Sequence, residues 1–350
     1  MSTVTRTLGW MMAMVPFLLG GCASFQQDSN KALIREPGYR RYTHPPVDVS
    51  EPAKVVWEYA VLSENVYIGE WKKQHQVPPQ AAQVLELPEA TPQAYADLCV
   101  PESRKPLPLR DWTMWENFPS PDLIQEARRV GLFMEVWEKQ SSPAVIAVVF
   151  RGTEFTSVKD WASNLRWFLR FIPFHEDQYT VVSKKVSREF VDRLAERRPD
   201  LRSIDTQAVR IVATGHSLGA GLAQHFSYSM PPRSKGGTPL PRVSNVYAFD
   251  PSPVTGWFSV DSDLRTTNAA GLWIDRTFEH GEILAYVRLL LSYVNPPSAA
   301  HPSIREVRYN FVKSANPFNS HSMRLLACAL INASGQAHLP QLLERFRGSP

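Results

Sequence analysis

The sequence of 350 residues contains only three cysteines, which excludes a disulfide-dense scaffold and a metal site built from several thiolates. An excess of one charge is also missing: 38 Lys and Arg against 34 Asp and Glu leave a net charge of +4. A nucleic-acid partner is therefore not expected, because such proteins usually carry a concentrated basic face. Metal-ligand spacings of the HExxH type and glycine-rich phosphate loops are absent as well, so the sequence predicts neither a metal nor a cofactor.

The N-terminus is predicted to be a targeting segment rather than part of the fold. Arg6 precedes an apolar run at residues 8–19, which is too short to cross a bilayer as a helix but suits the core of a signal peptide. The run ends in Leu19-Gly20-Gly21-Cys22, which resembles the bacterial lipobox, whose cysteine is acylated and becomes the mature N-terminus. The pattern predicts a signal peptide at residues 1–21 and a lipid anchor on Cys22 that tethers the protein.

The residues after the predicted cleavage point indicate a location. Ala23, rather than Asp, follows Cys22, and by resemblance to lipoprotein sorting rules this favours the bacterial outer membrane, facing the periplasm. Residues 22–50 are polar and predict a lipid-anchored tether, and residues 51–350 predict the domain.

Cys99 and Cys328 are the two thiols that remain once Cys22 is acylated. They can pair in an oxidising periplasm or stay buried as free thiols, and the sequence leaves both open.

Alternating strands and helices in the second half of the chain predict an α/β fold. Such an order favours a mostly parallel central sheet with helices on both faces, and an apolar content of 43% is ample for its core. Helices are expected at residues 53–67, 121–130, 181–197, 218–230, 283–294 and 323–330. Strands are expected at residues 132–137, 144–150, 209–214, 243–249, 272–278 and 306–312. The proline-rich residues 72–120 predict an irregular insertion.

A nucleophile elbow is predicted at Gly215-His216-Ser217-Leu218-Gly219. A serine on a sharp turn between a strand and a helix has a strained backbone, and its neighbours two residues away are crowded, so both must be glycine. An apolar strand ends directly before the motif, and a helix of small residues begins directly after it. The context therefore favours Ser217 as a catalytic nucleophile at the N-terminal end of a helix.

The elbow and three further stretches resemble the class 3 lipases, the fungal-type lipases of the α/β-hydrolase fold. Residues 60–67, Ala-Val-Leu-Ser-Glu-Asn-Val-Tyr, are similar to a helix near the start of that domain. Val149-Phe-Arg-Gly-Thr153 is similar to its oxyanion strand and loop, and residues 160–165 are similar to the motif that follows. The resemblance covers residues 55–330, with residues 72–120 as an insertion, and implies hydrolysis of carboxylic esters.

Two backbone groups are expected to form the oxyanion hole. The first is the N–H of Leu218, the residue after the nucleophile. The resemblance assigns the second to Thr153, through its backbone N–H and its hydroxyl. Donors held at these positions would stabilise the negative charge that a tetrahedral intermediate places on the former carbonyl oxygen.

The general base is predicted to be His321, which follows the last strand by a short loop; His301, before that strand, is its rival. The triad acid stays open between two residues. Glu282 has the spacing of the class 3 acid motif, although that family has Asp at this position. Asp250 ends the preceding strand in a stretch that looks like the acid loop of pancreatic-type lipases, where class 3 members usually have Gly. Either carboxylate would hold the imidazole in one tautomer and stabilise its cation.

The resemblance to class 3 lipases implies a lid after the oxyanion loop. Four apolar side chains recur at helical spacing between arginines, which suits contact with a lipid interface. They are Trp167, Phe168, Phe171 and Ile172. The alternative is a buried aromatic helix, and the sequence does not separate the two.

Three functions are compatible with these features of the chain. The first is a membrane-tethered serine hydrolase that cleaves lipid esters, as a lipase, phospholipase or esterase, through an acyl-enzyme. The second is a catalytically inactive hydrolase fold that serves as an envelope binding or scaffold lipoprotein. The third is a peptidase or thioesterase built on the same triad. Detection of an activated serine would exclude the inactive scaffold but would be consistent with either of the two enzymes.

Overall fold

The computed structural model describes residues 28–42, 45–74, 87–100, 103–152, 177–202, 209–282, 284, 301–312 and 319–339. The signal peptide, Cys22, Thr153, the predicted lid and most of the predicted helix 283–294 lie outside these residues. Among the helices within them, none combines the length and the apolar character needed to cross a bilayer.

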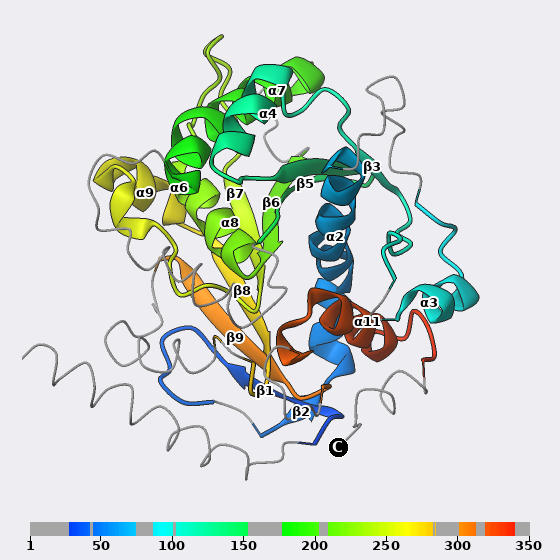
Figure 1. Cartoon of the computed structure of the whole chain (residues 1–350). Coiled ribbons are helices and arrows are strands. Elements are labelled where there is room, and N and C mark those ends of the chain that lie inside the picture. Colours follow the sequence, from blue (N-terminus) through cyan, green and yellow to red (C-terminus); the bar gives the residue numbers. More distant parts are fainter. Residues whose placement is uncertain are drawn as a thin grey trace, which may run out of the picture.

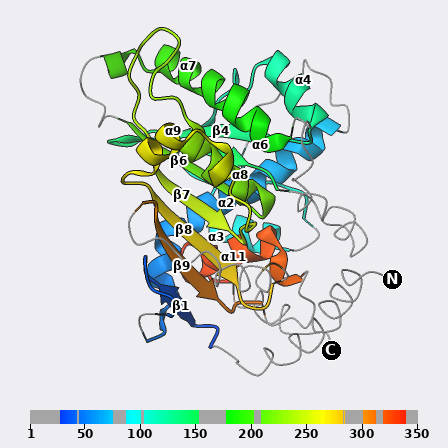
Figure 2. The same cartoon turned by 90° about the vertical axis from the view of Figure 1, so that its left-hand side faces the viewer.

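Nine strands form one mixed sheet in the order β2-β1-β9-β8-β7-β6-β5-β4-β3 (Figures 1 and 2). The strands are β1 (Lys31–Arg35), β2 (Val47–Asp48), β3 (Trp112–Met114), β4 (Met134–Lys139), β5 (Ala144–Phe150), β6 (Val209–His216), β7 (Val243–Phe249), β8 (Trp273–Glu279) and β9 (Ser303–Tyr309). Strands β5 to β9 pair in parallel, and antiparallel strands flank them on both sides. This arrangement confirms the predicted α/β-hydrolase class, with the parallel strands at the centre of the sheet.

Apolar periodicity along the chain and capping residues at the helix ends favour the main helices of the fold. They are α2 (Ser50–Gln74), α3 (Pro92–Leu98), α4 (Pro121–Arg129), α6 (Gln178–Val181), α7 (Ser187–Arg197), α8 (Leu218–Ser229), α9 (Ser262–Ala269) and α11 (Met323–Ala333). Helix α4 illustrates the local signals. Its N-cap Ser120 accepts a hydrogen bond from the backbone of Leu123, Pro121 occupies the first turn, and two arginines occupy the last turn.

The helices cover both faces of the sheet. Successive side chains of a strand point to opposite faces, and β5 shows the consequence: Ala147 and Val149 join one core cluster, whereas Ile146 and Val148 join the other. The first cluster contains the buried faces of α2 and α11, and the second contains those of α4, α7 and α8. Since both of its faces are buried, β5 reads as a continuous apolar run rather than an alternating one.

Three segments depart from the expected organisation. Lys31–Arg35 lies within the predicted tether, but it forms β1, which pairs with β9 and is held by an ion pair between Arg35 and Glu306. The proline-rich insertion contains helix α3 and strand β3 rather than irregular chain alone. The last strand also begins at Ser303, three residues earlier than expected. Short edge strands of this kind depend on pairing with distant residues, which periodicity does not reveal.

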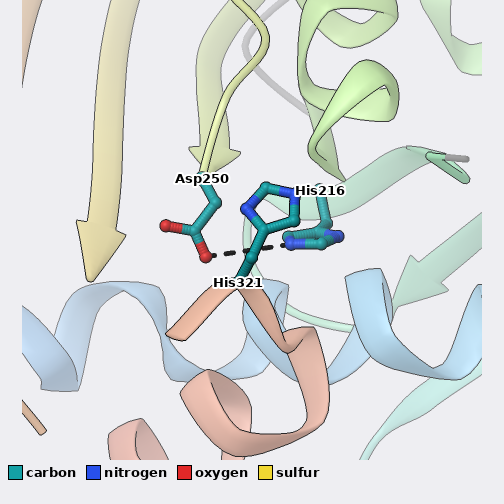
Figure 3. A group of neighbouring side chains, drawn as sticks. All are labelled: His216, Asp250 and His321. Carbon is teal, nitrogen blue, oxygen red and sulfur yellow. Dashed lines mark ion pairs between the residues drawn. The ribbon is translucent and has the colours of Figure 1, made fainter. Parts of the chain in front are cut away.

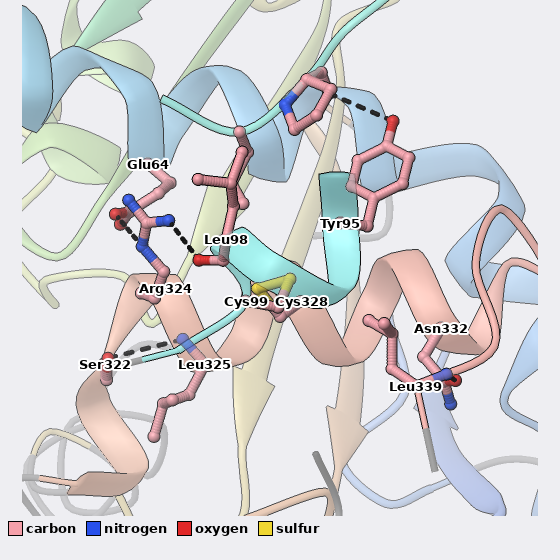
Figure 4. Close-up of a disulfide and its surroundings, with 12 residues drawn as sticks. Glu64, Tyr95, Leu98, Cys99, Ser322, Arg324, Leu325, Cys328, Asn332 and Leu339 are labelled. Carbon is pink, nitrogen blue, oxygen red and sulfur yellow. Dashed lines mark hydrogen bonds and ion pairs between the residues drawn. A yellow bond between two sulfur atoms is a disulfide. The ribbon is translucent and has the colours of Figure 1, made fainter. Parts of the chain in front are cut away.

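A disulfide joins the insertion to the C-terminal helix. Cys99, at the end of α3, is bonded to Cys328 in α11, and both residues are buried (Figure 4). Arg324, one turn before Cys328, pairs with Glu64 of α2 and donates hydrogen bonds to the backbone oxygens of Leu98 and Lys105. The helix that follows His321 is therefore fixed to the rest of the domain by one covalent and several polar contacts.

Replacing both cysteines with alanine is expected to lower the free energy of unfolding by about 2–5 kcal/mol, because the disulfide restricts the unfolded chain across a long loop. Its partners are 229 positions apart in the sequence. Urea unfolding of the double variant measures the effect, with chemically reduced wild type as the control that leaves both side chains in place. Identical unfolding midpoints for the oxidised wild type, the reduced wild type and the variant would contradict the expectation.

Candidate active site

The carboxyl ends of neighbouring parallel strands bring four candidate catalytic side chains to one edge of the sheet. Ser217 follows β6, Asp250 follows β7, and Glu282 comes three residues after β8. His321 ends the short helix η7 (Asn319–His321), which lies between β9 and α11. Residues that are far apart in the chain meet here because the carboxyl ends of parallel strands share one edge.

Ser217 lies on the sharp turn between β6 and α8. Its φ of 56° falls in the region that side chains other than glycine rarely adopt. The backbone around the turn holds it there: Ser217 N donates to the Phe249 oxygen at 2.9 Å, and Ser252 N donates to the Ser217 oxygen at 3.0 Å. Strain of about 1–3 kcal/mol persists only where the surrounding structure over-determines it. The observed turn is the one that a nucleophile elbow requires.

Close backbone packing explains the glycines around this turn. A Cβ on Gly219 would lie 2.2 Å from the carbonyl oxygen of Phe150, and a Cβ on Gly215 would lie 2.6 Å from the same atom. Gly152 is equally confined, since its Cβ would lie 2.4 Å from the carbonyl oxygen of His216. The end of β5 is therefore in direct contact with the first turn of α8.

The first turn of α8 also supplies the predicted oxyanion donor. Leu218 is the first residue of the helix, where a backbone N–H has no acceptor within the helix and the helix dipole is positive. An anion next to Ser217 Oγ would be stabilised at this position. Thr153, the second predicted donor, lies outside the described residues and directly follows Gly152.

A chain of hydrogen bonds runs from Ser217 through His321 to Glu282. The Nε2 atom of His321 lies 3.1 Å from Ser217 Oγ, and its Nδ1 atom lies 2.9 Å from Glu282 Oε2. All three residues are buried: Ser217 is 2% exposed, His321 is 6% exposed and Glu282 is fully enclosed. The backbone N–H of Leu284 donates a second hydrogen bond to the same oxygen, Glu282 Oε2, at 2.8 Å, and this contact fixes the carboxylate. Each nitrogen of the imidazole therefore faces a different protein partner.

Asp250 places a second buried carboxylate beside the same histidine. Its Oδ1 accepts a hydrogen bond from the backbone N–H of Glu279 at 3.0 Å, and its Oδ2 lies 3.8 Å from Nε2 of His216. Figure 3 shows Asp250 on one side of His321 and His216 on the other. Of the two candidate acids, Glu282 makes the hydrogen bond to Nδ1 of His321, whereas Asp250 faces His216.

His216, Asp250 and His321 each offer one ligand atom, and these atoms lie within 4.8 Å of one another. Imidazole nitrogens and a carboxylate oxygen are donors that zinc accepts. The two nitrogens of His321, however, already face Ser217 and Glu282. A cation bound by the three residues would have to take His321 from one of these partners, so the arrangement fits proton transfer better than metal binding.

Tyr67 connects the elbow to the end of β5, a contact that the sequence did not reveal. Its hydroxyl accepts a hydrogen bond from the backbone N–H of Gly152 at 3.2 Å and lies 2.9 Å from Nδ1 of His216. Burial, and then the charge of His321, hold the pKa of the His216 imidazole well below its usual value. His216 is therefore neutral and serves as a hydrogen-bonding residue in the wall of the site.

A buried carboxyl group next to the candidate acid was also not expected from sequence. Glu279 ends β8, is fully buried, and accepts a hydrogen bond from the backbone N–H of Val312 at 3.0 Å. Burial raises the pKa of Glu279 to about 8, and the nearby charge of Glu282 adds to the rise, against backbone hydrogen bonds that lower it. At neutral pH Glu279 is mostly protonated, so it adds little negative charge behind the site.

Replacing Glu279 with glutamine is expected to remove a pH-dependent loss of stability. The folded protein keeps the Glu279 proton up to about pH 8, whereas the unfolded chain releases it near 4.5, so the folded state binds more protons between these values. The free energy of unfolding of the wild type therefore falls as the pH rises through this window, by up to about 1.4 kcal/mol per pH unit. Urea unfolding of both proteins across the window measures the difference, and parallel curves would contradict the assignment.

The remaining predicted site residues are elsewhere or outside the described part. His301 is exposed and lies before β9, at the amino end of the parallel strands and thus at the opposite edge of the sheet from Ser217. The structure therefore does not bring this rival base to the site. The apolar lid residues Trp167, Phe168, Phe171 and Ile172, like Cys22, lie outside the described residues and remain predictions.

Residues 147–251 match the family model described as Lipase (class 3). Over these residues the chain is similar to class 3 lipases. The match contains the end of β5, the elbow with Ser217 and the position of Asp250, whereas Glu282 and His321 lie beyond it. No curated protein matches the chain.

Solved structures of fungal lipases are among the similar proteins. The lipase–propeptide complex of Rhizomucor miehei is 15% identical, with a TM-score of 0.38, and the similarity covers 75% of this chain and 71% of that one. A lipase from Rhizopus microsporus var. chinensis is 14% identical, with a TM-score of 0.31, and covers 67% of this chain and 69% of that one.

Proposed function

We propose that this protein is a serine hydrolase that cleaves carboxylic esters of lipids through a triad of Ser217, His321 and Glu282. The observation that carries the proposal is the continuous hydrogen-bonded chain Oγ–Nε2 and Nδ1–Oε2, with lengths of 3.1 and 2.9 Å. A nucleophile, a base and an orienting carboxylate in this order are what acyl transfer through a serine requires.

The geometry supports the following sequence of steps. Nε2 of His321 takes the proton of Ser217 as Oγ attacks the ester carbonyl, and the N–H of Leu218 stabilises the oxyanion, with Thr153 as its proposed partner. The imidazolium then donates that proton to the leaving alcohol as the ester bond breaks, which leaves an acyl-enzyme. Water, deprotonated by the same nitrogen, attacks the acyl-enzyme and releases the acid.

Glu282 is the proposed acid of the triad. Its Oε2 faces the Nδ1 proton of His321, so it favours the tautomer whose Nε2 is free to accept the serine proton. Glutamate is one carbon longer than the aspartate of class 3 lipases, and its position three residues beyond β8 gives it the reach to Nδ1.

A lipid ester is the proposed substrate class. Ser217 is only 2% exposed, so an ester reaches Oγ only after neighbouring residues move. A lid with the apolar residues 167, 168, 171 and 172 would respond to a lipid surface in this way. The match to class 3 lipases supports the same substrate class.

The lipid anchor belongs to the proposal as well. Acylation at Cys22 would tether the enzyme to the bacterial outer membrane, next to glycerolipid or phospholipid esters. The supporting observation is the sequence Leu19-Gly20-Gly21-Cys22 after an apolar run. Metabolic labelling with a palmitate analogue tests it: labelled wild type and unlabelled Cys22→Ser are expected, and equal labelling of both would contradict it.

A substrate panel tests the activity. Purified protein is expected to hydrolyse soluble p-nitrophenyl esters, and to hydrolyse triacylglycerol emulsions or phospholipid vesicles faster once the substrate forms an interface. A peptide amide and an acyl thioester serve as comparisons. Faster cleavage of either comparison than of every oxygen ester would overturn the substrate class, and no hydrolysis of any acyl compound would overturn the function.

A further inference from the structure

Glu279 lies among the strand ends that carry the candidate site. It is the last residue of β8, between β7, which leads to Asp250, and β9, which precedes His321 (Figure 2). Its backbone N–H donates to Oδ1 of Asp250 at 3.0 Å, and Glu282 follows it in the same loop. The mechanism proposed above gives Glu279 no part, although it is connected to the segments that carry the base and the acid.

The side chain of Glu279 holds the segment that follows β9. Where β9 ends, the backbone N–H of His280 donates to the Tyr309 oxygen at 2.8 Å. Beyond this bond, the backbone N–H of Val312 donates to Oε1 of Glu279 at 3.0 Å, so a side chain of β8 takes over as the acceptor. Val312 and its neighbour Phe311 are buried. A buried N–H that loses its acceptor costs about 1–3 kcal/mol, so this segment would move if the acceptor were removed.

The contact does not need a charge on Glu279. Burial raises the pKa of this carboxyl to about 8 and the charge of Glu282 adds to the rise, against the backbone N–H groups of Val312, Phe311 and His280, which lower it. A protonated carboxyl still accepts a hydrogen bond through its carbonyl oxygen. At neutral pH Glu279 therefore binds the Val312 N–H without a further negative charge beside Glu282.

His321 is held from two directions along the chain. It is the last residue of η7, directly before α11, which the disulfide and the ion pair described above join to the rest of the domain. Towards the N-terminus, Glu279 holds the chain at Val312. The distance of 3.1 Å between Nε2 of His321 and Oγ of Ser217 depends on both fixed points.

We infer that Glu279 is a positioning residue for His321: its carboxyl group fixes the segment after β9 and thereby keeps the imidazole between Ser217 and Glu282. The inference rests on the proposed function and extends it to a residue that acts through the backbone rather than on the ester. Its loss should therefore lower kcat more than it changes KM, because a misplacement of about 1 Å can cost 100-fold in rate.

Two substitutions of Glu279 test the inference. Glu279→Leu removes the acceptor and keeps a similar size, whereas Glu279→Gln keeps a neutral side chain with an oxygen acceptor. On a soluble p-nitrophenyl ester at pH 7, we expect kcat to fall about 30- to 100-fold in Glu279→Leu and to stay within about threefold of the wild type in Glu279→Gln. KM should stay within about threefold in both. Initial rates, with thermal unfolding of each variant, provide the measurement.

Glu138→Leu is the matched control. Glu138 is another buried glutamate, in β4, where it accepts a hydrogen bond from Nε1 of Trp115 at 2.9 Å and pairs with Ile146, away from the carboxyl edge of the parallel strands. This variant should lose stability but keep its kcat. Equal losses of kcat in both leucine variants would overturn the inference, as would a folded Glu279→Leu with the kcat of the wild type, or a Glu279→Gln as impaired as Glu279→Leu. An inactive wild type would instead overturn the proposed function.

If Glu279→Leu does not fold, Glu279→Asp takes its place. Aspartate keeps the polar group but withdraws the acceptor from the Val312 N–H by one carbon. We then expect kcat to fall about tenfold. A folded Glu279→Asp with the kcat of the wild type would overturn the inference.

The pH profile supplies a readout that a purely structural role would not change. If Glu279→Leu loosens the bond between His321 and Glu282, the imidazolium is less stabilised, so the acid limb of kcat/KM should move to lower pH. Glu279→Gln should keep the acid limb, since Glu279 is already neutral there. The titratable groups around His321 and Glu279, all retained in both variants, are Glu282, Asp250, His216, Tyr67, His280 and Tyr309. An unchanged acid limb in a folded Glu279→Leu would contradict the inference.

Discussion

Replacing Ser217 with alanine is expected to lower kcat for ester hydrolysis by about 10⁴- to 10⁶-fold, and His321→Ala should lower it as much. The reason is that nucleophile and base act as a unit: Oγ is a weak nucleophile unless Nε2, 3.1 Å away, takes its proton. The double variant should therefore be no less active than either single variant. Initial rates on a soluble ester, with thermal unfolding of each variant, provide the measurement.

Two matched controls belong to this prediction. Ser227→Ala removes another buried serine hydroxyl from α8, where it bonds only to its own helix at Ala223. His301→Ala removes the rival base, which is exposed at the opposite edge of the sheet. Both should keep activity within a few-fold of the wild type. Equal losses in Ser227→Ala and Ser217→Ala would mean that general destabilisation, not loss of a nucleophile, explains the result.

Replacing Gly219 with alanine is expected to lower kcat/KM by at least about 100-fold, or to prevent folding. The added Cβ would lie 2.2 Å from the Phe150 oxygen and 2.8 Å from the Arg151 carbonyl carbon, and both are backbone atoms that cannot rotate away. Relief requires α8 to move from β5, which shifts Ser217 relative to His321, and a misplacement of about 1 Å can cost 100-fold.

Gly236→Ala is the control for this substitution. Gly236 lies in the loop between α8 and β7, where the nearest atom to an added Cβ is 3.8 Å away. Activity and unfolding midpoint should match those of the wild type. If Gly219→Ala behaved like Gly236→Ala in both measurements, the tight contact between β5 and α8 would be refuted.

The elbow could be predicted from sequence because its chemistry is local. The glycines at 215 and 219, the apolar strand before them and the small residues after them lie within one short stretch, and the structure gives Ser217 the strained turn that this pattern requires. Strand β5 and most of β6 could be predicted for a similar reason, since burial on both faces produces apolar runs.

Which of the two carboxylates contacts Nδ1 of His321 could not be predicted, because it depends on the direction of side chains. Glu282 and Asp250 both follow strands that neighbour each other in the sheet, so both approach the same edge. Only the positions of their oxygens show that Glu282 bonds to Nδ1 of His321 and that Asp250 faces His216.

Contacts between distant residues were also beyond prediction. Strand β1 lies within the predicted tether and gains its stability from pairing with β9, far along the chain. The disulfide joins residues 229 positions apart, and Tyr67 meets His216 across 149 positions. No periodicity in the sequence encodes such pairs, so their discovery required the fold.

Labelling with a fluorophosphonate tests the central claim, an activated serine at the elbow, most directly. The full chain is treated with the probe in the presence of detergent, digested, and mapped by mass spectrometry, with Ser217→Ala and Ser227→Ala in parallel. We predict an adduct on Ser217 in the wild type and in Ser227→Ala, and none in Ser217→Ala. A folded wild type without an adduct, or an adduct on a different serine, would contradict the account and favour a hydrolase fold that serves as an inactive scaffold.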